Sequence, residues 1–367
     1  MKIELLREEL LRPLQGVAGV VERRQTLPIL GNVRLETTAG GDIHLTTTDL
    51  EVEMTADIAN GGREPGATTV SARKLLDICR ALPEGATMRL NEEQGRLTLQ
   101  AGSSRFVLGA LAAEEFPVVG DIADGLSFEI QRTVLEELLR RTSFAMAQQD
   151  VRHYLTGLLL EVGGKRLRAV CTDGHRLALA DAEKAPGVSG EQAVIIPRKA
   201  VMELERLLGQ AEETVTVTLS PRHARFGLGA LTLTSKLIDA QFPEYSRVVP
   251  TETPFSILVD RGPLREAVAR VAILANEKFR GVRLEAEDNR LKLTSHNPES
   301  EEAEERVSAR YAGERLVTAF NAGYVQDVLG VLESETVEIS FTSAESSALI
   351  REPGSDRCRY VIMPIRL

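Results

Sequence analysis

The chain has 367 residues, of which 54 are acidic and 44 basic, so its formal net charge is -10. That balance argues against a protein held on nucleic acid or an anionic membrane by overall charge. An apolar fraction of 43% can supply a core for each of the two or three domains expected at roughly 150 residues per domain, and it excludes disorder, collagen and coiled coil. The first nine residues are charged and no apolar run reaches the ~18 residues of a membrane span, so we expect a cytoplasmic protein.

Three cysteines, Cys79, Cys171 and Cys358, are widely separated and form no C-x-x-C pair. Isolated cysteines usually act as small buried hydrophobes, so we predict neither a disulfide framework nor a zinc site. The 5 histidines do not recur at metal-ligand spacing, and the sequence has no complete phosphate-binding glycine loop and no G-x-S-x-G motif. We therefore expect no metal, no cofactor and no catalytic centre.

The first third of the chain has the pattern of an α+β domain with two similar halves. A helical periodicity over 8–21 is followed by strand-like runs near 30–37, 42–48 and 51–58; a second helix over 72–81 is followed by runs near 86–91, 95–101 and 104–109. Apolar and polar residues alternate in these runs. They indicate antiparallel sheets with one face buried beneath the helices.

The same pattern recurs twice further along the chain. Landmarks repeat at intervals of 124 to 126 residues: Gly31, Gly157 and Gly281; Thr48-Asp49 and Thr172-Asp173; Phe116-Pro117 and Phe242-Pro243. A repeat of this period predicts three similar domains, 1–125, 127–250 and 252–367, with boundaries where Gly, Asp and Pro gather.

The string Asp173-Gly174-His175-Arg176 is the most site-like in the chain. It could hold an acid–base pair at a turn between strands. Asp-Gly is also a tight-turn signal, and Thr48-Asp49 occupies the same repeat position without His or Arg. We favour the turn.

The charge is divided unevenly along the chain. Residues 1–126 hold 13 bases and 19 acids, residues 127–251 hold 16 and 15, and residues 252–367 hold 15 and 20. The bases recur on the predicted helices and the links that follow them. If the helices of all domains share one side, that side is basic and would contact phosphates without reading sequence. Any single one of these bases is more typical of a solvated helix surface, and it is their recurrence across the domains that favours binding.

Six strings resemble one known family, the bacterial β sliding clamps, which are processivity subunits of DNA polymerase III. They are Thr26–Asn32, Glu64–Val70, Ala72–Lys74, Thr172–Leu177, Asn276–Leu284 and Val361–Leu367. The resemblance covers the full length and implies the DNA-clamp fold: three domains per chain, closed by a head-to-tail homodimer into a ring with helices inside and sheets outside. It implies a non-enzymatic protein that encircles double-stranded DNA and tethers the replicative polymerase, the clamp loader and other partners.

The resemblance also assigns two sets of binding residues by position. The DNA contacts are Arg24, Arg73, Gln149, His153 and Tyr154. The pocket for partner peptides comprises Leu155, Thr172, Gly174, His175, Arg176, Leu177, Pro243, Arg247, Val248, Val361, Ile362, Met363, Pro364 and Arg366. An apolar groove with a few polar groups suits a short linear peptide with Gln and Leu or Phe anchors. The alternative for Val361–Met363 is a plain core strand.

The ring interface implied by the resemblance joins the first domain to the third domain of another copy. It pairs Lys74, Arg105, Phe106 and Leu108 with Ile273, Leu274, Glu299, Glu301 and Glu305. Alone, the acidic run reads as a solvated loop, whereas opposite basic residues it would set the register.

Two other functions stay open at this point. A peptide-binding scaffold would use the pocket without a topological hold on DNA. An α+β hydrolase would use His175, although no nucleophile and base accompany it.

Overall fold

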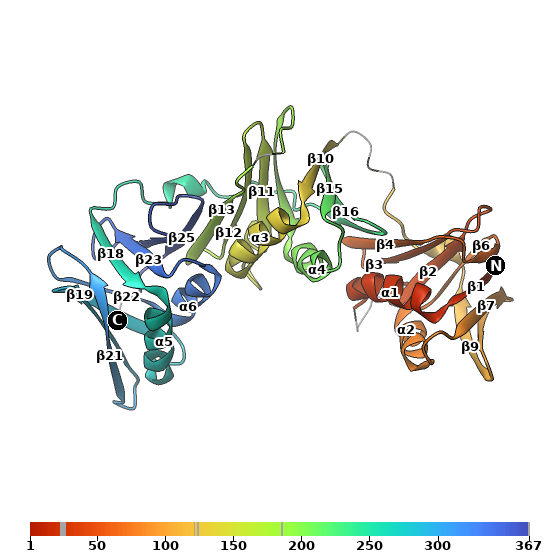
Figure 1. Cartoon of the computed structure of the whole chain (residues 1–367), viewed down its shortest axis with the longest axis horizontal. Coiled ribbons are helices and arrows are strands. Elements are labelled where there is room, and N and C mark those ends of the chain that lie inside the picture. The colour runs from red at the N-terminus through yellow and green to blue at the C-terminus, as the bar shows by residue number, and fades with distance from the viewer. Residues whose placement is uncertain (23–26, 121, 123–124, 185, 366–367) are drawn as a thin grey trace. The chain divides into compact units, whose positions relative to one another are not determined.

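The structure is a computed structural model that describes the chain except residues 23–26, 121, 123–124, 185 and 366–367 (Figure 1). The chain forms two compact units, Met1–Leu135 with Lys199–Leu237 and Glu136–Arg198 with Ile238–Leu367. Over the described residues the first unit contains one 13-stranded sheet and the second one 12-stranded sheet. No helix in this part of the chain is long and apolar enough to cross a membrane.

The elements fall into three repeats of the same order. The first repeat has β1 (Lys2–Leu6), α1 (Arg7–Val17), β2 (Asn32–Thr37), β3 (Ile43–Thr48), β4 (Val52–Ile58), the short β5 (Gly62–Glu64), β6 (Gly66–Ser71), α2 (Ala72–Ala81), β7 (Thr87–Glu93), β8 (Arg96–Ala101) and β9 (Ser104–Leu111). The second has β10 (Leu126–Gln131), α3 (Arg132–Thr142), β11 (Gly157–Gly163), β12 (Arg166–Thr172), β13 (Arg176–Asp181), β14 (Glu191–Pro197), α4 (Arg198–Leu208), β15 (Thr214–Leu219), β16 (His223–Leu228) and β17 (Leu231–Lys236). The third has β18 (Phe255–Asp260), α5 (Arg261–Val271), β19 (Gly281–Glu287), β20 (Arg290–His296), β21 (Glu302–Arg310), β22 (Leu316–Asn321), α6 (Ala322–Val331), β23 (Thr336–Phe341), β24 (Ala348–Arg351) and β25 (Cys358–Ile362).

The predicted α+β class and the predicted strands of the first repeat are confirmed, but each half-repeat has one strand more than expected, and the first repeat also has the short β5. The extra strand directly precedes the helix, as β6 precedes α2. It was missed because no turn separates the two elements: Ser71 ends β6 and is also the N-cap of α2, its hydroxyl accepting the Lys74 N–H.

Each extra strand joins the sheet of the other half of its repeat. β1 pairs with β7 and β6 with β2; likewise β10 pairs with β15, β14 with β11, β18 with β23 and β22 with β19, all antiparallel. The two halves of a repeat therefore complete each other.

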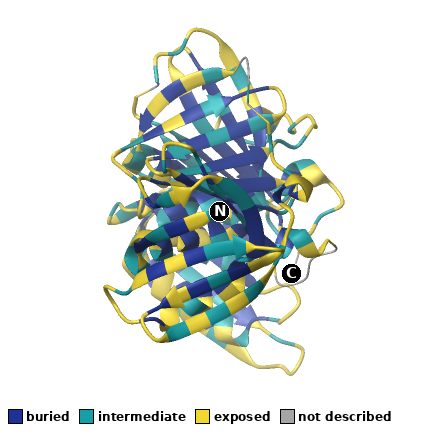
Figure 2. Ribbon diagram, turned by 90° about the vertical axis from the view of Figure 1, so that its right-hand side faces the viewer, coloured by how far each residue is buried: buried dark blue, intermediate teal, exposed yellow. Residues whose placement is uncertain are grey.

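The helices and sheets bury one face each, as the alternating sequence predicts. In α1 the predicted apolar face is buried at Leu10, Leu14 and Val17, and α1 packs on β3, β4 and α2. Buried and more exposed residues alternate along many strands (Figure 2), as in β8 and β10, whereas β11 and β13 are buried at almost every residue. All three cysteines are buried, as predicted.

The sheets continue from one repeat into the next. β4 of the first repeat pairs with β17 of the second inside the first unit, over five residue pairs from Leu231 and Ala56 to Ser235 and Val52. Inside the second unit, β13 of the second repeat pairs with β25 of the third. This second junction positions the candidate site.

Candidate functional site

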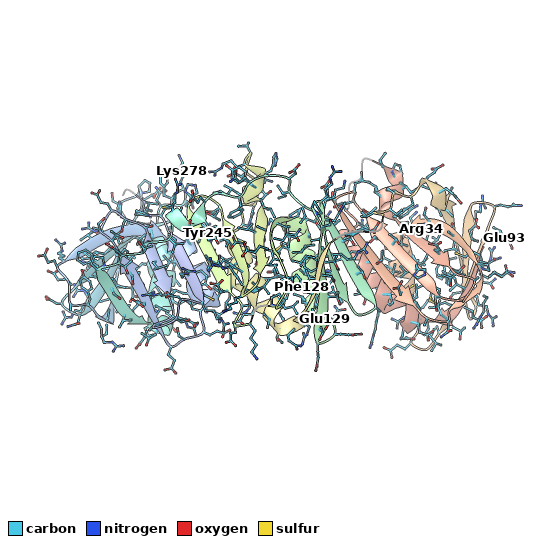
Figure 3. All side chains as sticks on the ribbon, turned by 90° about the horizontal axis from the view of Figure 1, so that it is seen from above. Arg34, Glu93, Phe128, Glu129, Tyr245 and Lys278 are labelled. Carbon is cyan, nitrogen blue, oxygen red and sulfur yellow. The ribbon has the colours of Figure 1, made fainter. Side chains whose placement is uncertain are left out.

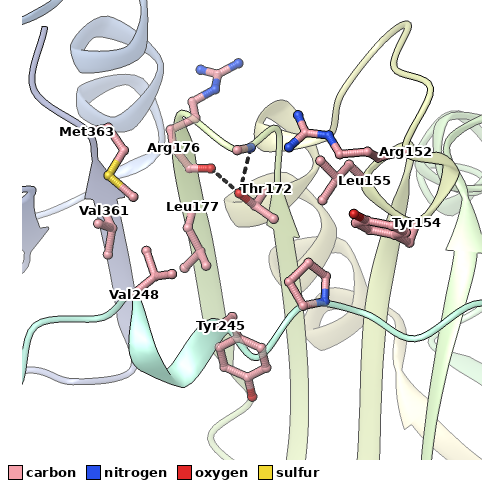
Figure 4. A pocket seen from close by; sticks show the side chains of 12 residues that line it. Arg152, Tyr154, Leu155, Thr172, Arg176, Leu177, Tyr245, Val248, Val361 and Met363 are labelled. Carbon is pink, nitrogen blue, oxygen red and sulfur yellow. Dashed lines mark hydrogen bonds between the residues drawn. The ribbon is translucent and has the colours of Figure 1, made fainter.

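A groove lies beside the β13–β25 pair, entirely within the second unit (Figure 4). We call it the β13–β25 groove. It encloses about 280 Å³ and is lined by Arg152, Tyr154, Leu155, Thr172, Gly174, Arg176, Leu177, Pro243, Tyr245, Val248, Val361 and Met363. Its floor is apolar, because Leu177 and Val361 belong to a buried cluster with Leu159 and Val170. Polar groups stand mainly at one end.

The turn between β12 and β13 supplies that polar end. The Thr172 hydroxyl donates to the Arg176 carbonyl oxygen (2.6 Å) and accepts the Gly174 N–H (3.1 Å). Asp173 Oδ1 accepts the N–H groups of His175 (2.9 Å) and Arg176 (3.0 Å). Gly174 has φ +88°, which a residue without Cβ adopts readily. The carboxylate is thus engaged in the turn, as the preferred interpretation of this string requires.

The first repeat builds the same turn with the same hydrogen bonds. The Thr48 hydroxyl donates to the Val52 carbonyl oxygen (2.9 Å) and accepts the Leu50 N–H (3.0 Å). Asp49 Oδ1 accepts the N–H groups of Glu51 (2.9 Å) and Val52 (2.7 Å). The alignment of Thr48-Asp49 with Thr172-Asp173 therefore reflects a repeated structure.

Arg176 ties the groove to neighbouring elements. Its Nε donates to Asp173 Oδ2 (3.1 Å) and its Nη2 to the Phe144 carbonyl oxygen (2.7 Å), while its Nη1 forms an ion pair with Asp327 of α6. The guanidinium also lies 4.4 Å from the ring centroid of Tyr324. These contacts hold its side chain in one orientation at the groove wall.

Three lining residues were not predicted for the groove. Tyr154, which was predicted as a DNA contact, also lines the groove, where its ring packs against the apolar cluster. Arg152 stands at the rim, and its hydrogen bonds to Asp150 hold the pKa of that carboxyl at about 2. Tyr245 reaches the groove from the segment that joins the second repeat to the third. Arg152 and Tyr154 could have been predicted only from their position in the sequence, within three residues of the predicted groove residue Leu155.

Some residues predicted for the groove lie outside its lining. His175 is exposed, and its carbonyl oxygen accepts the Met363 N–H (2.9 Å). Ile362 is fully buried, and Arg247 is exposed and paired with Glu244 (2.7 Å). Pro364 follows β25 without lining the cavity. Arg366 lies outside the described residues.

The predicted DNA contacts are spread over both units. Arg24 lies outside the described residues. Arg73 is exposed on α2, and Gln149 and His153 are exposed on the loop that precedes β11.

The recurrent helix bases do not form one uniform exposed row. Arg7 donates to the Cys79 carbonyl oxygen (2.7 Å) and Arg206 to the Gly16 carbonyl oxygen (2.7 Å). Arg141 is buried and pairs with Glu137 and Glu333. These bases stabilise packing, and the binding surface inferred from their recurrence is correspondingly smaller.

The residues predicted for the dimer interface lie along two sheet edges and their neighbours. Arg105, Phe106 and Leu108 lie on β9, and Lys74 is exposed on α2. Ile273 is 77% exposed, and Leu274 beside it is half-buried. Figure 3 labels three exposed charged side chains of the structure, Glu93 on β7, Glu129 on β10 and Lys278.

The acidic run of the third repeat is partly neutralised within its own chain. Glu305 accepts hydrogen bonds from Arg270 (2.6 Å), which lower the pKa of its carboxyl. Glu301 accepts from the Asn297 side chain (2.6 Å), and Glu299 is exposed. The charge left to complement another copy is smaller than the composition suggests.

Comparison with known proteins gives a consistent result along the whole chain. Models of the DNA polymerase III beta subunit match as its N-terminal domain (residues 1–120), central domain (129–244) and C-terminal domain (246–366). The beta sliding clamp of Pseudomonas putida is 48% identical and that of Escherichia coli K12 45% identical, each over 100% of both chains. The solved DNA polymerase III subunit beta of Pseudomonas aeruginosa superposes with a TM-score of 0.96 at 47% identity, and a sliding clamp of that organism bound to griselimycin with 0.95 at 48%, each covering 100% of both chains.

Proposed function

The chain belongs to the DNA polymerase III beta subunit family, and we propose that it acts as a sliding clamp, a non-catalytic ring around duplex DNA that tethers the replicative polymerase and other partners. We assign its three clamp domains to residues 1–125, 127–250 and 252–367. We infer that it works in the cytoplasm on chromosomal DNA, because its family serves replication.

Two open sheet edges are the observation that carries the proposal. On β9, residues Ser104–Gly109 pair with β8 on one side and with no described strand on the other. On β21, residues Glu302–Ser308 pair with β20 and likewise have an open second edge within the described chain. Open edges invite pairing with another strand.

Head-to-tail association of two copies would cover both edges. The β9 of one copy would pair with the β21 of its partner, and the reciprocal contact would close the particle. Arg105 and the exposed Val107 on β9 suit the acidic and apolar character of the β21 edge. If this heterologous contact closes after two copies, it gives a homodimeric ring.

A ring would hold DNA without high affinity. The net charge of -10 disfavours tight binding, whereas a few cations and hydrogen-bond donors suffice for sliding contacts with phosphates. We assign this role to Arg24, Arg73, Gln149 and His153. Tyr154 we assign to the β13–β25 groove, because its ring packs there.

The β13–β25 groove would receive the linear peptide motif of polymerase, clamp-loader and other partners. Its apolar floor suits Leu or Phe anchors, and the Thr172 turn with Arg152 and Arg176 offers polar groups for a Gln side chain.

The proposal is tested by comparing how well the protein is retained on circular and on linear duplex DNA. The protein, loaded by a clamp loader and ATP onto nicked circular duplex, should remain bound through gel filtration and dissociate once the circle is linearised. Equal loss from circle and linear duplex would contradict a ring and support the scaffold alternative.

A further inference from the structure

One wall of the β13–β25 groove is a segment without regular strand pairing, Ile238–Val249. It joins β17 to β18 and contributes Pro243, Tyr245 and Val248 to the groove. The Ile238 N–H donates to the Ile195 carbonyl oxygen (2.9 Å), which fixes the beginning of the segment on β14. The position of the rest of the wall therefore depends on the contacts that the segment makes after Ile238.

Beyond Ile238, the segment's backbone hydrogen bonds are local. The Tyr245 N–H donates to the Pro243 carbonyl oxygen (2.7 Å), and the Val248 N–H to the Tyr245 carbonyl oxygen (3.0 Å). These bonds shape a turn but do not join it to the sheet. Among the described residues, the side-chain hydrogen bonds that join 239–249 to the sheet all involve the Tyr245 hydroxyl.

That hydroxyl is held between two charged side chains. It donates to Glu161 Oε2 (2.6 Å) and accepts from Arg168 Nη1 (3.1 Å). Arg168 in turn forms a two-bond ion pair with Asp181 (2.7 and 2.7 Å). In Figure 4 the hydroxyl points away from the other lining side chains, so the ring faces the groove while its polar end is anchored behind it.

The anchoring groups lie in register across the sheet. Glu161 on β11 is the cross-strand partner of Arg168 on β12, and Arg168 is the partner of Asp181 on β13. These charged groups form one connected base, because the Tyr245 hydroxyl bridges Glu161 and Arg168, and Arg168 is paired with Asp181.

We propose that Tyr245 is a positioning residue of the groove: its hydroxyl, held by Glu161 and Arg168, fixes the Ile238–Val249 wall in its peptide-accepting place. The inference rests on the proposed role of the groove. A peptide then meets a wall that is already ordered and loses less binding free energy to ordering it.

The test is the affinity of a synthetic peptide with Gln and Leu-Phe anchors. Tyr245→Phe keeps the ring and removes both hydrogen bonds, so we expect the dissociation constant to rise about threefold to tenfold. Glu161→Ala should behave similarly. Glu161→Gln, which keeps an acceptor oxygen for the hydroxyl, should stay near the wild-type value.

Tyr311→Phe is the matched control. It also removes one tyrosine hydroxyl bond, to the Glu314 carbonyl oxygen (2.6 Å), outside the residues that line the groove. It should leave peptide affinity unchanged. Hydrogen exchange should show faster exchange of the Val248 amide in Tyr245→Phe and not in Tyr311→Phe.

The outcomes distinguish the peptide-binding function of the groove from the positioning role of Tyr245. If the wild-type chain binds no peptide, the proposed function of the groove is wrong. If the wild type binds but Tyr245→Phe binds equally well, the positioning role is wrong. A lower melting temperature with unchanged affinity of the folded protein would also overturn it, because the tyrosine would then serve stability alone.

Discussion

Glu53 is a buried carboxylate at the junction of the first and second repeats. It is 5% exposed and stands opposite Thr234 in the β4–β17 pair. Its Oε2 accepts the Val119 N–H (2.7 Å). Burial raises the pKa of Glu53, and this effect outweighs the opposing hydrogen bond from Val119 and the attraction of Arg225 and Arg34. The charged form therefore costs stability in the folded chain.

The sign of the pH dependence follows from that shift. A carboxyl whose folded pKa lies above its unfolded value takes up protons more readily in the folded state, so its cost is fully present above the folded pKa and disappears below the unfolded pKa, about 4.3. Glu53→Gln keeps an acceptor for Val119 and removes the charge. We predict a higher melting temperature at pH 7 to 8, with the gain shrinking toward pH 4.

Melting curves between pH 4 and 8 check this prediction. Glu129→Gln, an exposed change on β10 of the same sheet, is the control and should show no comparable trend. A gain from Glu53→Gln that is larger at pH 4 than at pH 8 would contradict the assignment.

Single residues show what sequence could and could not predict. The Thr172-Asp173 turn was predictable, because its hydrogen bonds are local and the first repeat carries a second copy. Tyr245 and Arg152 were not, since their places in the groove depend on the tertiary path of the Ile238–Val249 segment and on a loop that meets the turn. Periodicity describes neither.

At the scale of elements, the main feature is that the strand before each helix joins the sheet of the other half of its repeat. β1 pairs with β7 in one half of the first repeat, whereas α1, which begins at the next residue, packs on β3 and β4 in the other half. Neither half has its full sheet alone. We infer that the two halves fold and unfold together.

Ile3→Ala tests this coupling. Ile3 is 2% exposed on β1, so its truncation should destabilise the repeat by about 2–5 kcal/mol. Native-state hydrogen exchange should accelerate equally in β2–β4 and β7–β9. Val118→Ala, at a site 57% exposed, should change neither, and acceleration confined to β7–β9 would show that the halves unfold separately.

Sequence periodicity revealed the repeat, but it did not reveal that strands pair with the other half of their repeat. Helices and strand triplets each have their own pattern, so they could be placed to within a few residues. Which sheet a strand joins is decided by long-range pairing, and the 66–71 run reads the same whether it pairs with β2 or with β7.

At the scale of the whole molecule, the proposal separates two functions that need different degrees of assembly. The β13–β25 groove is complete within the second unit of one chain. Retention on DNA instead requires two copies to close. A change that opens the interface should therefore abolish retention and leave peptide binding intact.

The substitution Ile273→Asp should separate retention on DNA from peptide binding. Ile273 is 77% exposed in the described chain, and burying an aspartate at a dimer interface would cost roughly 2 kcal/mol or more, about 30-fold in the dissociation constant. Sedimentation velocity should show monomers at concentrations where the wild type is a dimer, the protein should be lost from nicked circles, and peptide affinity should match the wild type. Met202→Asp, at a site 46% exposed on α4, should stay dimeric. A dimeric Ile273→Asp protein would remove this residue from the interface, and a monomer still retained on circles would show that retention does not depend on closure.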